Sequence, residues 1–223
     1  DTADYGIPQH RKRLVTVLSR NEHAKKQYLK NGSLFPEATQ PWITLREAIG
    51  NLPSLRAEKG KNKATGYDGL HKVPLLDAKK LFWIDNTPEG ASAFNNQCVN
   101  PACRFQGNKI HGASHDKNGI NKLHTDTPLY CEKCGALLPR PWVEDKKTGE
   151  KRLMKGFVSA YKRMNWDEPA STLTQNFQYA CSDNKLHPDQ SRVLSLYEGL
   201  IIQSIASYPF SFTIDGKLVS DGL

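Results

Sequence analysis

Hydrophobic residues in this chain occur as short runs between long polar stretches. Residues 14–18 form a run of leucine, valine and threonine between charged flanks, and this pattern predicts a strand. Asn21 is a favourable N-cap residue, and it predicts a short helix that runs to Leu29 and stops at Asn31 and Gly32. The first part of the chain is therefore expected to contain one strand and one helix.

Two capping boxes predict further helices. Thr44 is followed three residues later by Glu47, and Ser195 is followed in the same way by Glu198. In this arrangement the hydroxyl and the carboxylate each accept a hydrogen bond from a free backbone N–H group of the first helical turn. The first of these helices is expected to end between Gly50 and Pro53, and the second is apolar.

The middle of the chain has weaker periodicity. Residues 75–84 place apolar side chains at helical spacing and predict a third helix. Residues 86–128 are rich in Asn, Gly, His and Pro, so this stretch cannot bury enough apolar surface to order itself. From 129 to 181 the pattern becomes β-like, with pieces at 136–138 and 156–158 between turns.

Composition sets limits on the class of protein. The chain has 223 residues, a mass of 25.0 kDa, 38% hydrophobic residues and a mean hydropathy of -0.62. This length suits one domain, or one domain with a piece of another. No apolar run approaches the ~20 residues that cross a bilayer, and we expect no signal peptide, because the first residues lack a basic segment. We expect a cytoplasmic protein, and its first residues look like the interior of a longer chain.

Charge favours an anionic partner. The chain carries 31 Lys and Arg against 23 Asp and Glu, which gives a net charge of +8 and a pI of about 9.2. A basic balance of this kind favours polyanions such as nucleic acids.

Four of the five cysteines form two pairs with the spacing of metal knuckles. Cys98 and Cys103 form a C-x4-C pair, and Cys131 and Cys134 form a C-x2-C pair that ends in Gly135. Four thiolates suit a tetrahedral zinc ion and complete its coordination shell. The sequence therefore predicts a structural zinc site that orders the loop 98–134.

Other interpretations of the cysteines are less well supported. Free thiol pairs or a redox C-x-x-C are alternatives, but redox motifs accompany a βαβ pattern that this sequence lacks. Three histidines inside the loop are expected at the surface: His111, His115 and His124. The alternative that one of them replaces a cysteine as a zinc ligand stays open. Cys181 stands in an apolar setting and is expected to be a buried small residue.

Three segments carry the most specific patterns. Residues 4–17 contain a Gln-x-Arg-x-Arg motif after a Tyr-Gly-Ile-Pro turn, and residues 161–174 contain Trp-Asp-Glu-Pro-Ala-Ser-Thr-Leu-Thr. Residues 187–198 begin with His-Pro and carry an arginine before the second capping box. In this order the segments resemble motif VIII, the end of the target recognition domain and motif IX of DNA (cytosine-5) methyltransferases.

The resemblance implies a domain organisation. Residues 1–20 would be the end of a catalytic domain, with the motif VIII strand. Residues 21–185 would be the target recognition domain, with the zinc loop 98–134, and residues 186–223 the motif IX region that leads back to the catalytic domain. We expect an α+β fold, with a small irregular β-sheet, short helices and a zinc-knuckle insertion.

The resemblance also implies roles for individual residues. In the family the Gln-x-Arg-x-Arg side chains line the catalytic pocket, which makes Gln9, Arg11 and Arg13 the candidates here. Arg13 would donate to a flipped cytosine, and Arg11 would steady the pocket. The chain has no Phe-x-Gly-x-Gly motif for S-adenosylmethionine and no Pro-Cys nucleophile. The cofactor is therefore expected only in a full-length parent, and this chain is expected to be inactive alone.

Duplex DNA is the expected partner, bound by a monomer. Thr172 and Thr174 are expected at the DNA, with Leu173 in the core. A basic patch over residues 140–163 could follow phosphates, although residues 146–151 equally suit an exposed hairpin turn. The candidate phosphate contacts are Arg140, Lys155, Lys162 and Arg163.

The best-supported parent is a methyltransferase of a prokaryotic restriction–modification system. An alternative is a stand-alone zinc-ribbon nucleic-acid-binding module, which leaves residues 1–18 and 187–198 without explanation. A protein-interaction domain with an acidic partner is a third possibility, which salt-dependent binding to duplex DNA would distinguish.

Overall fold

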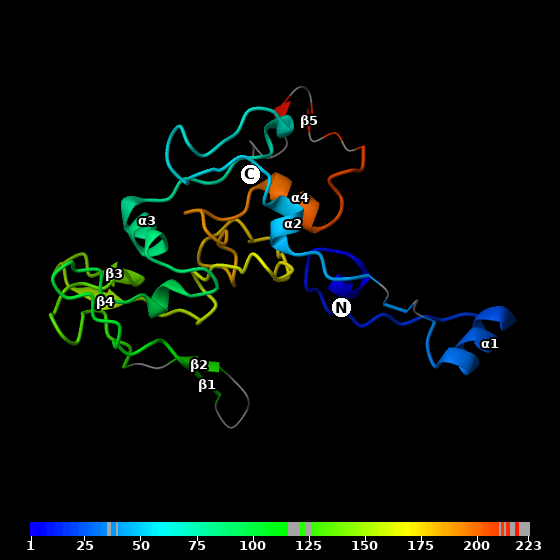
Figure 1. The fold of residues 1–223 in the computed structure, drawn as a ribbon, viewed down its shortest axis with the longest axis horizontal. Helices are drawn as coiled ribbons and strands as arrows, with labels where there is room; N and C mark the ends of the chain where they lie inside the picture. Colours follow the sequence, from blue (N-terminus) through cyan, green and yellow to red (C-terminus); the bar gives the residue numbers. More distant parts are fainter. Residues whose placement is uncertain are drawn as a thin grey trace.

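The computed structural model describes residues 1–34, 37–38, 40–115, 121–123, 126–209, 211, 213–214 and 217–218. Short elements lie among long turns and loops (Figure 1). The helices are α1 (Glu22–Asn31), α2 (Leu45–Ile49), α3 (Ala78–Asp85) and α4 (Leu196–Ile202), with 3-10 turns η1 (Thr2–Tyr5), η2 (Tyr67–Gly69) and η3 (Ala93–Asn95). No helix in these described ranges is both long and apolar enough to span a bilayer.

The strands are short and pair only with their neighbours in sequence. Within the described residues they form three antiparallel hairpins: β1 (Ala113–His115) with β2 (Asn121–Leu123), β3 (Trp142–Glu144) with β4 (Lys151–Leu153), and β5 (Thr213–Ile214) with β6 (Lys217–Leu218). The fold is therefore mixed α+β, as expected. It contains separate two-stranded sheets where a single small sheet was predicted. The β-like pieces 136–138 and 156–158 form no strand in the described structure.

Capping explains where the helices begin. The Thr44 hydroxyl accepts from the Glu47 N–H at 3.2 Å, and the Glu47 carboxylate accepts from the Thr44 N–H at 2.8 Å. Ser195 and Glu198 make the same reciprocal bonds at 3.2 and 2.7 Å, so both capping boxes are confirmed. The side chain of Asn21 likewise accepts from the backbone at the start of α1, as predicted.

The predicted strand at residues 14–18 is wrong for the described structure. This segment has no regular structure and leads from the N-terminal turn toward α1, which stands apart from the rest of the molecule (Figure 1). Leu14 is 96% exposed and Leu18 is 92% exposed. A β-rich sequence forms a strand only where a neighbouring strand accepts it, and no described strand lies beside this one.

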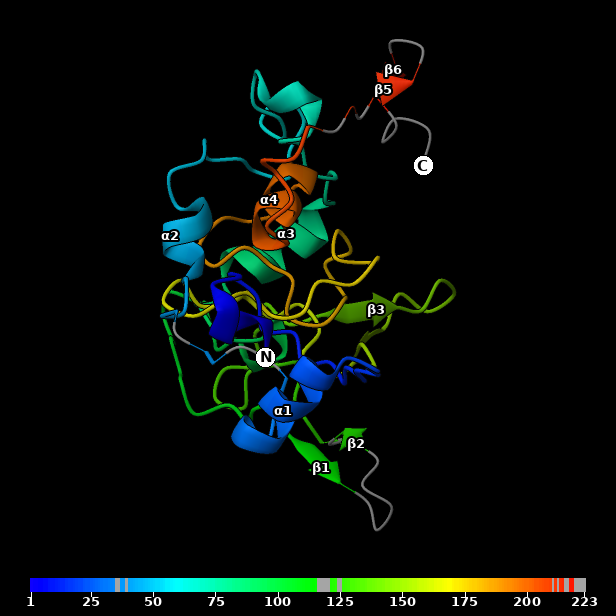
Figure 2. The ribbon, with the colours of Figure 1, turned by 90° about the vertical axis from the view of Figure 1, so that its right-hand side faces the viewer.

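Two apolar clusters form most of the core. The first is aromatic, with Trp83 at 5.0 Å from Trp142 and 5.4 Å from Tyr161, measured between ring centroids. The second cluster lies where α2 packs against α4 (Figure 2), and it includes Leu45 and Leu173. Leu173 is buried, as predicted.

The segment before α4 is held by a buried polar cluster. His187 is 1% exposed, and its Nδ1 lies 3.2 Å from the backbone N of Gln190 and 3.1 Å from a carboxylate oxygen of Asp189. Its Nε2 lies 3.8 Å from a carboxylate oxygen of Glu198. Burial lowers the pKa of His187 below its ordinary value of about 6.5, although Asp189 and Glu198 oppose the shift.

We expect the stability of the chain to fall as the pH drops below about 6.5. Below this pH the unfolded chain binds a proton on His187 and the folded chain does not. The free energy of unfolding therefore falls by up to ~1.4 kcal/mol per pH unit, until the pH reaches the lowered pKa of His187 in the folded chain. Urea unfolding at pH 7.5, 6.5 and 5.5 measures this loss. His187→Gln should flatten the pH dependence in this window. Parallel curves for the variant and the wild type would contradict the assignment.

Candidate nucleic-acid interface and metal site

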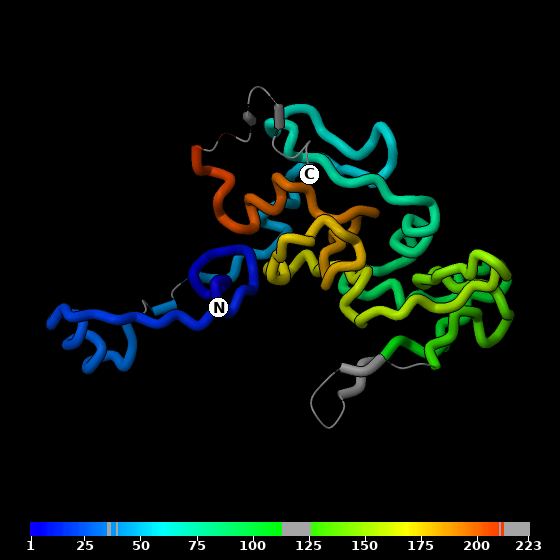
Figure 3. Tube along the Cα trace, turned by 180° about the vertical axis from the view of Figure 1, so that it is seen from behind, coloured from blue at the N-terminus to red at the C-terminus, as the bar shows by residue number. Residues whose placement is uncertain are grey.

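The segment around the Gln-x-Arg-x-Arg motif is clamped to the segment around Thr172. The two segments lie side by side, and Gln9 and Ala170 form a parallel bridge (Figure 3). The backbone N–H of His10 donates to the Ala170 carbonyl at 2.8 Å, and the Thr172 hydroxyl donates to the His10 carbonyl at 2.5 Å. The side-chain oxygen of Gln9 accepts from the Leu173 N–H at 2.7 Å. The fold thus brings together two of the segments that the sequence singled out.

The first two residues of the motif face this clamp. Gln9 is 2% exposed, and its amide holds Leu173. Arg11 is half-buried, and its guanidinium donates to the Leu173 carbonyl at 3.3 Å. Their observed contacts therefore position the 170–174 segment.

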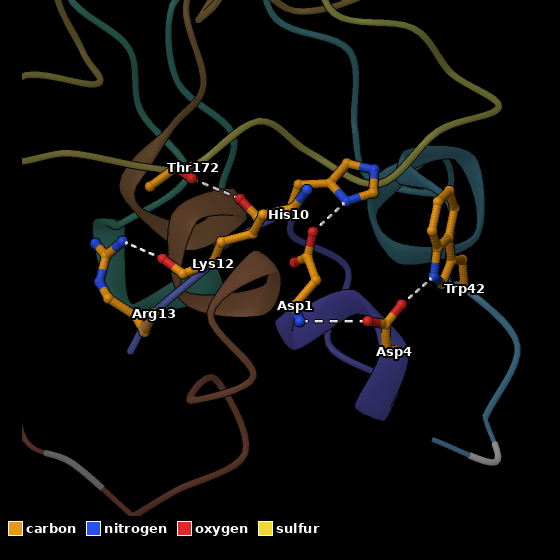
Figure 4. A pocket seen from close by; sticks show the side chains of 7 residues that line it. All are labelled: Asp1, Asp4, His10, Lys12, Arg13, Trp42 and Thr172. Atoms are coloured by element: carbon orange, nitrogen blue, oxygen red, sulfur yellow. Dashed lines mark hydrogen bonds and ion pairs between the residues drawn. The ribbon is translucent and has the colours of Figure 1, made fainter. Parts of the chain in front are cut away.

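Arg13 and Thr172 line one cavity of about 620 Å³ (Figure 4). The exposed side chains of Lys12 and Arg13 lie on one side, where the Arg13 guanidinium donates to the Lys12 carbonyl at 2.8 Å. Thr174 is exposed but does not line the cavity. The full lining is Asp1, Asp4, His10, Lys12, Arg13, Trp42 and Thr172.

The other side of the cavity carries two carboxylates with fixed partners. Asp4 accepts from the indole N–H of Trp42 at 2.9 Å and pairs with the N-terminal ammonium of Asp1 at 3.3 Å, and these two contacts lower the pKa of Asp4 below its usual range. Asp1 lies 3.1 Å from Nδ1 of His10. The cavity therefore has two basic side chains on one side and two carboxylates on the other, where the N-terminal ammonium of Asp1 also lies.

The four cysteines of the predicted knuckles come together. All four sulfur atoms lie within 4.8 Å of one another; the Cys98–Cys134 sulfur distance is 3.7 Å and the Cys103–Cys131 distance is 4.0 Å. A zinc ion with four sulfur ligands at about 2.3 Å requires sulfur separations of roughly 3.8 Å. The donor set and its spacing therefore fit a four-cysteine zinc site.

Backbone geometry supports the knuckle formed by Cys131 and Cys134. Gly135 has a φ of 71°, and its N–H donates to the Cys131 carbonyl at 2.8 Å, as its predicted turn role requires. Desolvation disfavours the Cys131 thiolate, but backbone N–H groups of Cys134 and Lys133 outweigh it and lower the pKa of Cys131 to about 6. Donors aimed at a sulfur favour the thiolate that binds a metal.

Residues 1–220 match the family model described as C-5 cytosine-specific DNA methylase. The chain belongs to this family. It is 27% identical over 205 residues to the Type II methyltransferase M1.HgaI of Avibacterium volantium, a match that covers 92% of this chain and 41% of that protein. It is 28% identical over 217 residues to the Type II methylase M.HgiDII of Herpetosiphon aurantiacus, with 96% and 45% covered. The chain thus spans less than half the length of these relatives.

Two predicted phosphate contacts of this methylase-family chain are wrong in the described structure. The first is Arg140, whose side chain has no exposed surface. Its guanidinium donates to the backbone carbonyls of Asn96, Lys109 and Pro128 at 2.8, 2.9 and 2.7 Å. Burial lowers the pKa of Arg140 to about 10. The residue therefore ties the loop before β1 to the start of the β3–β4 hairpin.

The second is Arg163, which is 3% exposed. Its guanidinium donates to the carbonyls of Thr87, Ile84, His187 and Gln190 at 2.7, 2.9, 2.8 and 2.6 Å. Burial lowers the pKa of Arg163 to about 10. A guanidinium with carbonyl partners on all sides is enclosed by the protein, so it has no surface for a phosphate.

The other basic candidates remain accessible. Lys155 is exposed and Lys162 is half-buried. Lys146 and Lys147 lie in the exposed turn of the β3–β4 hairpin, where Asp145 accepts from two backbone N–H groups of the turn. The hairpin interpretation of residues 146–151 is therefore confirmed, and a DNA contact there stays a prediction.

Two expectations about loop residues are corrected. His111 is buried, stacks on Phe94 with 4.7 Å between ring centroids, and bonds Thr127 at 2.9 Å, so it is neither a surface residue nor part of the sulfur cluster. Cys181 is exposed in a turn where burial was expected. The side chain of His115 and all of His124 lie outside the described residues.

Sequence reasoning missed two residues of the site. Lys185 is 2% exposed, and its ammonium donates to the Ser171 hydroxyl at 3.1 Å and the Thr172 carbonyl at 2.8 Å. Burial lowers the pKa of Lys185. Trp42 lines the cavity from a loop without apolar periodicity. The one available signal was a tryptophan in a polar stretch, with no core pattern to explain it.

Proposed function

We propose that this chain is the target-recognising part of a C-5 cytosine-specific DNA methylase of a bacterial restriction–modification system. The observation that carries the proposal is the cavity in which Arg13 and Thr172 meet. Membership of the methylase family and the net charge of +8 support duplex DNA as the partner. Residues 21–185 would form the recognition domain, between two segments of the catalytic domain.

The chemistry of the family sets what this chain must do. C5 of cytosine is a poor nucleophile inside a base stack, so the target base must be flipped out and held. We assign Arg13 to the flipped cytosine because a guanidinium stays charged and presents several donors in a fixed fork. S-adenosylmethionine would supply the methyl group in a full-length enzyme, and residues 1–223 contain no Phe-x-Gly-x-Gly motif that would bind it. Their own task is to bind and orient the DNA.

The remaining accessible residues would fix register and read bases. Lys12, Lys155 and Lys162 are our phosphate contacts, and Thr174 is our base-side candidate beside Thr172. Arg140 and Arg163 are not included, since both are enclosed by backbone carbonyls.

A single structural zinc would hold loop 98–134 within the recognition domain, with Cys98, Cys103, Cys131 and Cys134 as ligands. A stand-alone zinc-ribbon module has the same cysteines but does not account for the family match over residues 1–220. The exposed apolar run 14–18 also favours the methylase, because a strand-forming segment without a described partner suits a sheet of the catalytic domain.

Replacing Lys12 with Gln tests the proposal. We expect the variant to bind duplex DNA more weakly. The slope of log binding constant against log salt concentration should be shallower by about one, because one cation fewer displaces counterions from the DNA. Fluorescence anisotropy of a labelled duplex at several salt concentrations measures both. Lys59→Gln, at an exposed turn outside the cavity, is the matched control. Equal slopes for the two variants, or no duplex binding by the wild type, would contradict the proposal.

A further inference from the structure

Trp42 differs from the other tryptophans of the chain. All four lie in the described residues; Trp83, Trp142 and Trp166 are at most 8% exposed, whereas Trp42 is 54% exposed. Its indole lines the cavity that also holds Arg13 and Thr172. A large exposed aromatic surface in a concave site is unfavourable in water unless a ligand covers it.

Two contacts fix the orientation of this exposed ring. The indole N–H donates to Asp4 at 2.9 Å, and the indole and the imidazole of His10 form a T-shaped pair, with 4.8 Å between centroids and 86° between planes (Figure 4). His10 is itself held by Asp1 at 3.1 Å. The indole is therefore oriented before any ligand binds, which lowers the entropic cost of stacking on it.

The charge pattern of the cavity indicates what the indole receives. Lys12 and Arg13 lie on the side away from Trp42, and Asp4 lies beside the indole (Figure 4). A phosphate is favoured at the cationic side and disfavoured next to the Asp4 carboxylate. The side that carries Trp42 therefore suits a flat, uncharged ring. A nucleotide carries such a ring and a phosphate in one molecule.

We propose that Trp42 stacks on a nucleobase that leaves the base stack of the bound DNA, while an adjoining phosphate lies toward Lys12. This inference rests on the proposed function, since it takes DNA as the partner. Stacking on an aromatic face does not depend on base identity, so Trp42 contributes affinity and orientation and leaves sequence reading to other residues.

Tryptophan fluorescence tests this directly, because Trp42 is the exposed fluorophore. A duplex of about 30 base pairs is titrated into the full chain while emission and iodide quenching are followed, and anisotropy of the labelled duplex reports affinity in parallel. We expect emission to fall and iodide quenching to be suppressed on binding. Trp42→Ala should bind roughly 10-fold more weakly, the loss expected for one stacked base.

Two further variants separate the explanations. Trp42→Phe keeps a ring, so it should bind within a few-fold of the wild type but lose the emission change. Trp166→Phe alters a buried tryptophan and should keep the emission change. Unchanged emission on DNA binding, with wild-type affinity for Trp42→Ala, would overturn this inference and leave the proposed function standing. No duplex binding by the wild type would overturn both.

Discussion

Cys131→Ser is expected to release one bound zinc ion and to unfold the region from Cys98 to Leu138. The apolar cluster around the sulfur atoms contains, besides the cysteines, only Leu138 and the partly buried Phe105. Such a small apolar cluster cannot order a loop of this length, whereas structural zinc supplies roughly 10–16 kcal/mol in small metal-binding modules. Native mass spectrometry should show one zinc per wild-type chain, and hydrogen exchange should show lost protection across this region in the variant.

Cys181→Ser is the matched control for this experiment. Cys181 is exposed and lies outside the sulfur cluster, so its replacement removes a thiol without removing a ligand. The control should keep its zinc and its protection pattern. A wild-type chain purified without metal, or a Cys131→Ser chain that retains zinc, would contradict the metal site.

Glu198→Gln is expected to destabilise the chain by about 3–5 kcal/mol. Glu198 has no exposed surface, and both of its oxygens accept from Arg192 at 2.7 Å. Burial opposes ionisation of this carboxyl, but the Arg192 bonds outweigh it, and the pKa of Glu198 is lowered. The neutral amide leaves the buried guanidinium without a counter-charge.

Glu47→Gln provides the comparison, because Glu47 occupies the same capping-box position in α2 but is exposed. Its loss should cost ~1 kcal/mol or less. Urea unfolding at pH 7.5 gives both values from the midpoints and slopes. If Glu198→Gln lost no more stability than Glu47→Gln, the buried pair would not hold the start of α4 as described.

Features that depend on adjacent residues could be predicted from the sequence. The two capping boxes, the N-cap at Asn21 and the turn at Gly135 act within a few residues, so the chain fixes them locally. The knuckle spacing likewise predicted the cluster of four sulfurs, since each turn places two sulfurs close together and a zinc ion needs four such ligands.

Features that depend on distant partners could not be predicted in this way. Arg140 and Arg163 look like surface cations in the sequence, yet each is enclosed by carbonyls from segments tens of residues away. The 14–18 run has strand composition but no described strand beside it. Trp42 is held at the cavity by contacts with Asp4 and His10, which precede it by more than 30 residues.

Selection from a pool of duplexes with a randomised centre tests the recognition role most directly. The chain is incubated with the pool at physiological salt, the bound fraction is recovered over several rounds, and the duplexes are sequenced. A target-recognising part of a C-5 cytosine-specific DNA methylase should enrich one short sequence that contains a cytosine. Binding without enrichment, or no recovery above the level of beads alone, would contradict the assignment of this chain to target recognition.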